Sequence, residues 1–184
     1  KVLSNSQLIL YNGSPLESGK TYYWKVRWWD SKDRVSPFSE VATFEVGLLE
    51  ESDWKAKWIG REAYEYLTIE SKDIPFGRSY TIPYSALFRK GFSLKGQIRR
   101  ARAYISGLGL YELYINGCRV GDKVLDPGQT DYKKKVLYST YDVTSLLKEG
   151  ENAVGVILGN GRYVKDYGYD FPKLILQLEI EYID

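Results

Sequence analysis

The sequence contains no histidine and no methionine, and its single cysteine is Cys118. Without histidine, the Ser-His-Asp type of triad and histidine-ligated zinc sites are excluded. One cysteine cannot form an internal disulfide. Cys118 directly follows Asn116-Gly117 in a predicted hairpin turn and has no histidine to activate it, so we interpret it as a structural residue rather than a nucleophile.

Long apolar runs and a strong charge of one sign are missing as well. No stretch of 18 apolar residues occurs, so no membrane span is predicted. The formal net charge is +2, and the basic clusters 99–102 and 133–135 are too short for the extended footprint of a nucleic-acid site. We interpret them as solvated strand ends or turns. The first residues, Lys1-Val2-Leu3-Ser4, resemble neither an initiator methionine nor a signal peptide, so we expect a piece of a longer protein.

Aromatic residues are abundant instead, at 15% of the chain, which favours β structure. Three strands are predicted in residues 1–46, at 7–11, 22–29 and 41–46. The second alternates with period two and predicts a core face of Tyr22, Trp24, Val26 and Trp28. Leu16 followed by Tyr22 resembles the tyrosine corner of fibronectin type III sandwiches. Because such a module needs about seven strands, residues 1–46 are predicted to be its C-terminal part only.

Residues 47–60 are predicted to be a linker, whose Trp54 and Trp58 we expect in an interdomain contact. The polar stretch that follows, up to Pro83, predicts a long excursion with at most one short strand.

A second domain, residues 61–184, carries seven strand-like runs separated by turn signals. This pattern predicts a jelly-roll β-sandwich, so the fold class expected for the chain is all-β. The runs are 87–94, 101–106, 110–115, 119–125, 136–141, 152–158 and 174–182. Only 143–148 resembles a helical turn. In the third run, Tyr111, Leu113 and Ile115 should share one face and Leu110, Glu112 and Tyr114 the other.

A series of ordered motifs resembles a known family. In residues 87–163 they are Leu87-Phe88-Arg89-Lys90, Leu110-Tyr111-Glu112-Leu113-Tyr114-Ile115-Asn116-Gly117, Asp126-Pro127-Gly128-Gln129-Thr130, Tyr138-Ser139-Thr140-Tyr141-Asp142 and Gly159-Asn160-Gly161-Arg162-Tyr163. They resemble the N-terminal β-sandwich domain of bacterial α-L-rhamnosidases. Tyr22-Tyr23-Trp24-Lys25-Val26-Arg27 and Asp53-Trp54-Lys55-Ala56-Lys57-Trp58-Ile59 resemble the fibronectin-like module and junction that precede it.

The resemblance implies a non-catalytic role in a glycosidase. In that family the catalytic carboxylates lie on an (α/α)₆ barrel that follows the β-domains, so no catalytic residue is expected here. The chain would pack on that barrel or shape its cleft, in a parent that hydrolyses terminal α-L-rhamnose from glycans or glycosides. A periplasmic or secreted bacterial location goes with this assignment. The alternative that the family raises is a calcium-dependent rhamnose-binding module.

A structural role requires no cofactor, whereas a rhamnose-binding module of this family would need calcium. Calcium prefers six to eight oxygen ligands. The candidate ligands are Asn116 and Asn160, with Asp166 or Asp170 on the adjoining loop. We expect the two asparagine turns at the same end of the sandwich, where loops converge. Turn chemistry alone also explains both asparagines.

The candidate residues for a rhamnose-containing glycan are Tyr163, Tyr167 and Asp166, and Tyr169 and Phe171 are further aromatic platforms. Aromatic rings offer an apolar face to a sugar, but a packed aromatic cluster is the simpler explanation for these side chains. Gln129 and Arg162 stand where relatives commonly carry tryptophan, which removes aromatic surface from these turns.

Overall fold

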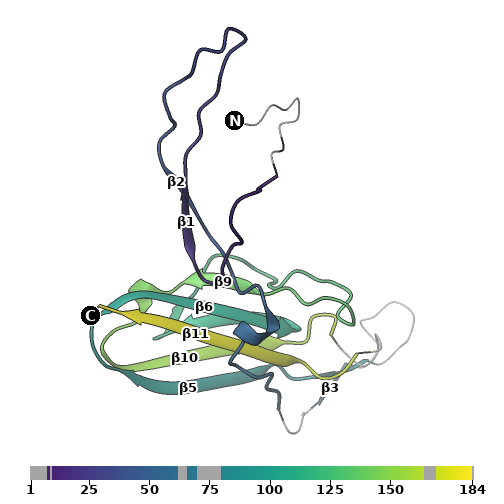
Figure 1. The fold of residues 1–184 in the computed structure, drawn as a ribbon. Coiled ribbons are helices and arrows are strands. Elements are labelled where there is room, and N and C mark those ends of the chain that lie inside the picture. The colour runs from purple at the N-terminus through teal and green to yellow at the C-terminus, as the bar shows by residue number, and fades with distance from the viewer. Residues whose placement is uncertain (1–7, 9, 62–65, 70–79, 164–168, 184) are drawn as a thin grey trace. The chain divides into compact units, whose positions relative to one another are not determined.

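The computed structural model describes Leu8 and residues 10–61, 66–69, 80–163 and 169–183, and its chain is drawn in Figure 1. The regular structure of these residues is β-strand apart from two short 3₁₀ turns, which confirms the all-β class. The chain divides into two compact units, Lys1–Trp54 and Lys55–Asp184.

In its described residues the first unit contains one antiparallel strand pair, β1 (Thr21–Trp24) and β2 (Ala42–Glu45), followed by the 3₁₀ turn η1 (Glu51–Asp53). Tyr22 stacks on Phe44 with ring centroids 5.5 Å apart. The Glu17 amide donates a hydrogen bond to the Tyr22 hydroxyl at 2.9 Å, so the predicted tyrosine corner is present. Of the strand predicted at 7–11, the described residues Leu8, Leu10 and Tyr11 form none.

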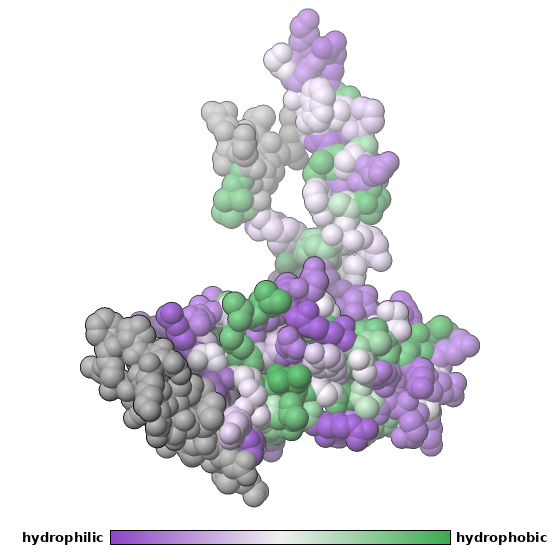
Figure 2. All heavy atoms as spheres, turned by 180° about the vertical axis from the view of Figure 1, so that it is seen from behind, coloured by the Kyte–Doolittle hydropathy of each residue, from purple (hydrophilic) through white to green (hydrophobic). Residues whose placement is uncertain are grey.

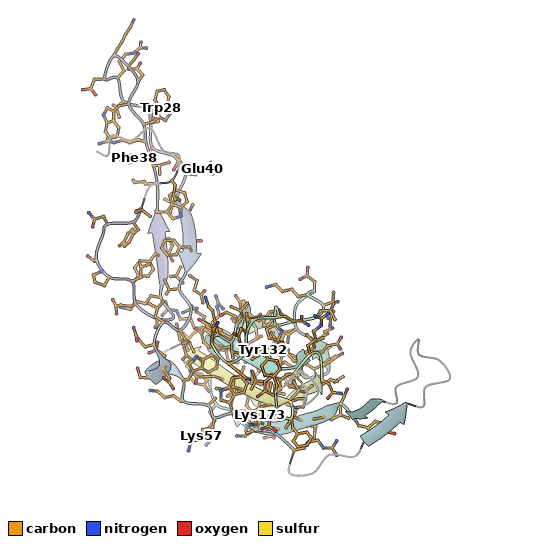
Figure 3. All side chains as sticks on the ribbon, turned by 90° about the vertical axis from the view of Figure 1, so that its right-hand side faces the viewer. Trp28, Phe38, Glu40, Lys57, Tyr132 and Lys173 are labelled. Atoms are coloured by element: carbon orange, nitrogen blue, oxygen red, sulfur yellow. The ribbon has the colours of Figure 1, made fainter. Side chains whose placement is uncertain are left out.

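The predicted core face of this unit is wrong for the residues present. Trp24, Val26 and Trp28 are 48%, 54% and 65% exposed, and Tyr22 is only partly buried. Two strands cannot bury either of their faces, so the aromatic side chains remain at the surface. Figure 2 shows hydrophobic side chains exposed along this hairpin, and Figure 3 labels Trp28 and Phe38 on it. The Arg27 guanidinium lies over the Phe38 ring, 4.6 Å from its centroid.

The second unit is a sandwich of two antiparallel sheets (Figure 1). The first sheet has the order β5 (Ala86–Leu94), β10 (Gly150–Gly159), β7 (Leu110–Ile115) and β8 (Cys118–Arg119). The second has the order β11 (Lys173–Tyr182), β6 (Ile98–Leu108) and β9 (Ser139–Asp142). The predicted helical turn is the 3₁₀ turn η3 (Thr144–Leu146). The excursion before β5 holds two paired strands rather than one, β3 (Tyr66–Ile69) and β4 (Tyr80–Pro83).

The apolar core of this unit lies between the two sheets. In β7 the buried residues alternate with half-buried ones, so Tyr111, Leu113 and Ile115 face the core as predicted. They pack with side chains from both sheets, including Ala101, Ala103, Ile105, Val143, Val156, Leu158 and Leu174. This alternation is what period-two hydrophobicity specifies.

Two local predictions fail because of backbone conformation. The strand predicted at 119–125 ends at Arg119, since Gly121 and Leu125 take the left-handed φ values of 73° and 57°. The sequence Pro127-Gly128 also predicts a type II turn, and this turn is not formed either. The Asp126–Pro127 peptide is cis, and Gly128 does not have the positive φ that the turn requires at this position.

Candidate functional site at the loop end of the sandwich

Three connections converge at one end of the sandwich. Strand pairing places Leu108 opposite Lys173 and Gly159 opposite Leu110, and Tyr111 forms a bridge with Asp126. The β6–β7 turn, the 126–138 loop and the β10–β11 loop therefore begin at the same edge of the fold. Loop clusters on a rigid scaffold are where binding residues concentrate, so this end is the candidate site.

The tight turn at this end depends on Gly109, whose φ is 127°. A β-carbon there would collide with the Gly159 carbonyl oxygen. Only glycine allows both this backbone conformation and this close approach of two chains. Gly109 thus holds the start of the β10–β11 loop against the β6–β7 turn.

Three tyrosines form a cluster at this end. Tyr163 stacks on Tyr169 with ring centroids 5.2 Å apart, and Tyr132 meets both rings edge-on at 5.4 and 5.3 Å. Figure 3 labels Tyr132, and also Lys173 at the start of β11. Burial raises the pKa of the Tyr132 and Tyr163 hydroxyls, so both are neutral at physiological pH. Because the rings of Tyr163 and Tyr169 cover one another, the cluster is packed rather than laid out as an open platform.

Of the predicted sugar-binding residues, the structure places Tyr163 in this cluster. Asp166 and Tyr167 lie outside the described residues. Asp170, named as a possible metal ligand, forms an ion pair with Lys173 at 3.0 Å. The cluster member that sequence reasoning missed is Tyr132, which lies in a polar, lysine-rich stretch without hydrophobic periodicity.

The carboxylate of Asp126 is the centre of a hydrogen-bond network at the same end of the sandwich. Its Oδ2 atom accepts hydrogen bonds from the hydroxyls of Tyr111 at 2.9 Å, Ser139 at 2.7 Å and Tyr141 at 2.6 Å. Burial alone would raise the pKa of this carboxyl, but the three hydrogen bonds outweigh it and hold the pKa below its ordinary value. Asp126 is therefore ionised, and its hydrogen bonds connect the loop after β8 to β7 and β9. Its acceptor atom Oδ2 is already occupied by protein donors.

The side chain of Asn116, a predicted metal ligand, is hydrogen-bonded to other groups of the protein. Its side-chain amide donates to the Leu146 carbonyl at 2.8 Å and to Asn152 Oδ1 at 2.9 Å. Its Oδ1 accepts from the Ala153 amide at 2.8 Å. With φ values of 50° and 84°, Asn116 and Gly117 form the predicted hairpin turn. Asn116 is thus a structural residue with all of these side-chain groups engaged.

The expectation that Asn116 and Asn160 lie at the same end is wrong. Asn116 is hydrogen-bonded to Ala153 near one end of β10, whereas Asn160 follows Gly159 at the other end. Seven residue steps along β10 separate Ala153 from Asn160, or about 23 Å at the usual rise per residue. Metal–oxygen distances are about 2.3–2.6 Å, so one calcium ion cannot take a ligand from both. Sequence reasoning failed here because it did not establish which turns lie at which end of β10.

Two further features concern the described part of the chain. No group of three or more aspartate, glutamate, cysteine or histidine residues there is placed to hold a metal ion. No helix among those residues is long and apolar enough to span a membrane.

Comparison with known proteins assigns both parts of the chain. Residues 96–184 match the family model of the α-L-rhamnosidase N-terminal domain, and residues 1–50 match that of the Rha78A-like N-terminal immunoglobulin domain. An α-L-rhamnosidase of Formosa agariphila is 40% identical over 96% of this chain. That alignment covers 19% of the relative, so the chain spans about a fifth of the length of the curated relatives it matches.

Solved structures give the same assignment. The α-L-rhamnosidase from Dictyoglumus thermophilum is 63% identical over 98% of this chain and 20% of its own, with a TM-score of 0.91. The native enzyme of the same name from Aspergillus terreus is 36% identical over 92% of this chain and 20% of its own, with a TM-score of 0.71. Together with the two domain matches, these similarities show that the chain belongs to the α-L-rhamnosidase family and corresponds to its N-terminal, non-catalytic β-sandwich region.

Proposed function

We propose that this chain is the accessory region of an enzyme that hydrolyses terminal α-L-rhamnose from glycans or glycosides, and that it packs on the catalytic (α/α)₆ barrel of that enzyme. The observation that carries the proposal is the 40% identity to an α-L-rhamnosidase along 96% of the chain. Because the alignment covers only 19% of that relative, the remainder of such an enzyme is available as the partner on which this chain packs.

The outer face of the β5–β10–β7–β8 sheet is the surface we assign to this contact. On it Leu87 and Ile157 lie opposite each other across β5 and β10, and they are 77% and 39% exposed. The outward face of an antiparallel sheet in water is normally polar, so a neighbouring apolar pair indicates a covered surface.

A shallow hollow of about 340 Å³ adjoins this pair. Its floor is Gly155, which has no side chain to fill the space between Arg89 on β5 and Tyr114 on β7. Tyr114 donates a hydrogen bond to Glu112 at 2.7 Å, and Glu112 lies 3.7 Å from the Arg119 guanidinium. An apolar centre with a polar rim is the arrangement found in protein interfaces.

The test is a double substitution, Leu87→Asp with Ile157→Asp, made both in this chain and in the full-length protein. In the isolated chain both positions face water, so the cost is limited to the repulsion of two carboxylates across the strand pair, and the melting temperature should fall by no more than about a few degrees. In the full-length protein the two carboxylates would in addition be buried without partners, and its melting temperature should fall by clearly more than that of the isolated chain, with loss of activity on an aryl α-L-rhamnoside.

Val124→Asp is the matched control, because Val124 is 73% exposed but belongs to the loop after β8. It should leave the full-length protein unchanged. Wild-type stability and activity of the full-length double variant would reject the proposed contact, and an inactive wild-type full-length protein would reject the proposed activity.

Two further assignments stay predictions. Sugar binding at Tyr163 would require the tyrosine cluster to open, since the rings now cover one another. A periplasmic or secreted location is tested by fractionating the native host and locating the full-length protein with an antibody.

A further inference from the structure

Strand β11 lies at the edge of its sheet. Its sheet partner in the described part of the chain is β6, on one side only. On the other side a single bridge is formed at the start of the strand, where Ile59 and Leu174 exchange two backbone hydrogen bonds of 2.8 Å. From Ile175 onward, no strand of the described chain pairs with that side.

The Ile59 bridge fixes which backbone groups of β11 point outward. In antiparallel pairing, successive residues direct their N–H and C=O groups to opposite sides of the strand. Because Leu174 bonds to Ile59, the groups of Leu176, Leu178 and Ile180 also point away from β6. The odd-numbered residues Ile175, Gln177 and Glu179 are therefore the ones that bond to β6.

The same even-numbered residues direct their side chains into an open groove of about 620 Å³ between the two sheets. Leu176, Leu178 and Ile180 are only partly buried there. The opposite wall comes from β5 and β10 and consists of Phe88, Phe92, Val154 and Val156. The groove thus has apolar walls from both sheets. The β11 edge beside it also has backbone donors and acceptors that pair with no strand of the described chain.

The strand count of the two sheets agrees with this gap. Among the described residues one sheet has four strands and the other three, whereas the predicted jelly roll has eight strands in two sheets. The vacant position is next to β11, directly over the groove.

We infer that a further β-strand of the same protein, from outside residues 1–184, pairs with the free edge of β11 and fills the groove with its inward-facing side chains. A source for this strand exists, because the family relatives are about five times as long as the matched region. Strand addition supplies both things that the edge lacks, backbone partners and apolar cover. This inference rests on the chain being part of a longer family member and not on the activity proposed above.

The charges around the groove restrict the sequence of that strand. The charged residues lining it are Lys57, Arg89 and Lys90, all cationic, although the strand parity of Arg89 directs its side chain to the outer face of the sheet. Lys90 has the strand parity of Phe88 and Phe92, so it faces inward between them. The inward face of the incoming strand should be mainly apolar and should carry at least one Asp or Glu where it meets Lys90, while its alternate residues face outward.

Amide hydrogen exchange at single-residue resolution tests the inference, with this chain alone compared with the full-length protein. The amides of Leu176, Leu178 and Ile180 should exchange at least about tenfold more slowly in the full-length protein than in the isolated chain. Those of Ile175, Gln177 and Glu179 are internal controls, since β6 protects them in both samples.

Equal, fast exchange of the even-numbered amides in both samples would overturn the inference. Protection already present in the isolated chain would overturn it too, and dependence of that protection on concentration would identify a second copy as the occupant. Assaying the same full-length sample on an aryl α-L-rhamnoside separates the two proposals, because an active enzyme with unprotected β11 amides rejects only the strand.

Discussion

The side chain of Asn116 donates a 2.9 Å hydrogen bond to Oδ1 of Asn152, a residue that is itself buried. Asn152 in turn donates to the carbonyls of Lys148 and Gly150. Two asparagines thus connect the β7–β8 turn to the loop before β10. This arrangement assigns Asn116 to stability and allows its contribution to be measured.

Asn116→Asp should destabilise the second unit by about 2–3 kcal/mol, because a carboxylate cannot donate and would face two acceptor oxygens, Leu146 O and Asn152 Oδ1. Turn chemistry alone predicts tolerance, since Asp also accepts a positive φ. Urea denaturation distinguishes the two. The control is Glu151→Gln, an exposed change on β10 next to Asn152, which should alter stability by less than about 0.5 kcal/mol.

Substitution of Gly109 by alanine should be among the most damaging single changes. The new β-carbon would meet the Gly159 carbonyl in a backbone conformation that alanine disfavours, so we expect a loss of more than about 3 kcal/mol or failure to fold. Gly150→Ala is the matched control. Gly150 also has a positive φ, of 83°, but nothing lies within 4 Å of its would-be β-carbon, so the loss should be about 1 kcal/mol. Similar losses for the two variants would contradict the close approach at Gly109.

Acid should weaken the fold through Asp126. Its carboxyl has a pKa below the ordinary 3.8 in the folded protein, so its stabilising contribution is complete above about pH 5 and is lost as the pH falls through the folded value. Asp142 acts in the same window, because bonds from Thr144 and Arg102 outweigh the effect of burial and lower its pKa. Melting temperatures should therefore be flat from pH 7 to 5 and fall below pH 4.

Asp126→Asn separates this contribution from that of Asp142. The variant should be less stable at pH 7 by about 1–2 kcal/mol, because the acceptor of three hydroxyls loses its charge. Its stability should then fall less steeply between pH 4 and 2 than that of the wild type. A parallel decline of the two proteins would show that Asp126 does not titrate in this range.

Calcium and L-rhamnose should leave the melting temperature of this chain unchanged, whether added singly or together at millimolar concentration. A ligand that binds only the folded state must stabilise it, and the predicted pair of asparagine ligands lies at opposite ends of β10. Differential scanning fluorimetry is sufficient for this test. A rise of several degrees that requires both additives would instead support a rhamnose-binding module.

Hydrophobic alternation predicted the strands that carry the core, because period-two burial is a local property of residues such as Leu113, Ile115, Val154 and Val156. It overextended the strand after Arg119, where left-handed backbone at Gly121 and Leu125 ends the pairing. The Asp126 network was not predictable in this way. Its donors, Tyr111, Ser139 and Tyr141, come from two strands of different sheets, and only the folded topology brings them to one carboxylate.

The amide of Ala153 donates its hydrogen bond to Asn116 Oδ1, a side-chain acceptor at a fixed point of the β7–β8 turn. A slip of β7 along β10 by one residue would break this bond and would also turn Leu113 and Ile115 out of the core. A slip by two residues would keep those side chains inside but would still leave the Ala153 amide without this acceptor. Asn116 therefore selects one register of β7 against β10. It also disfavours the two-residue slip that hydrophobicity alone would permit.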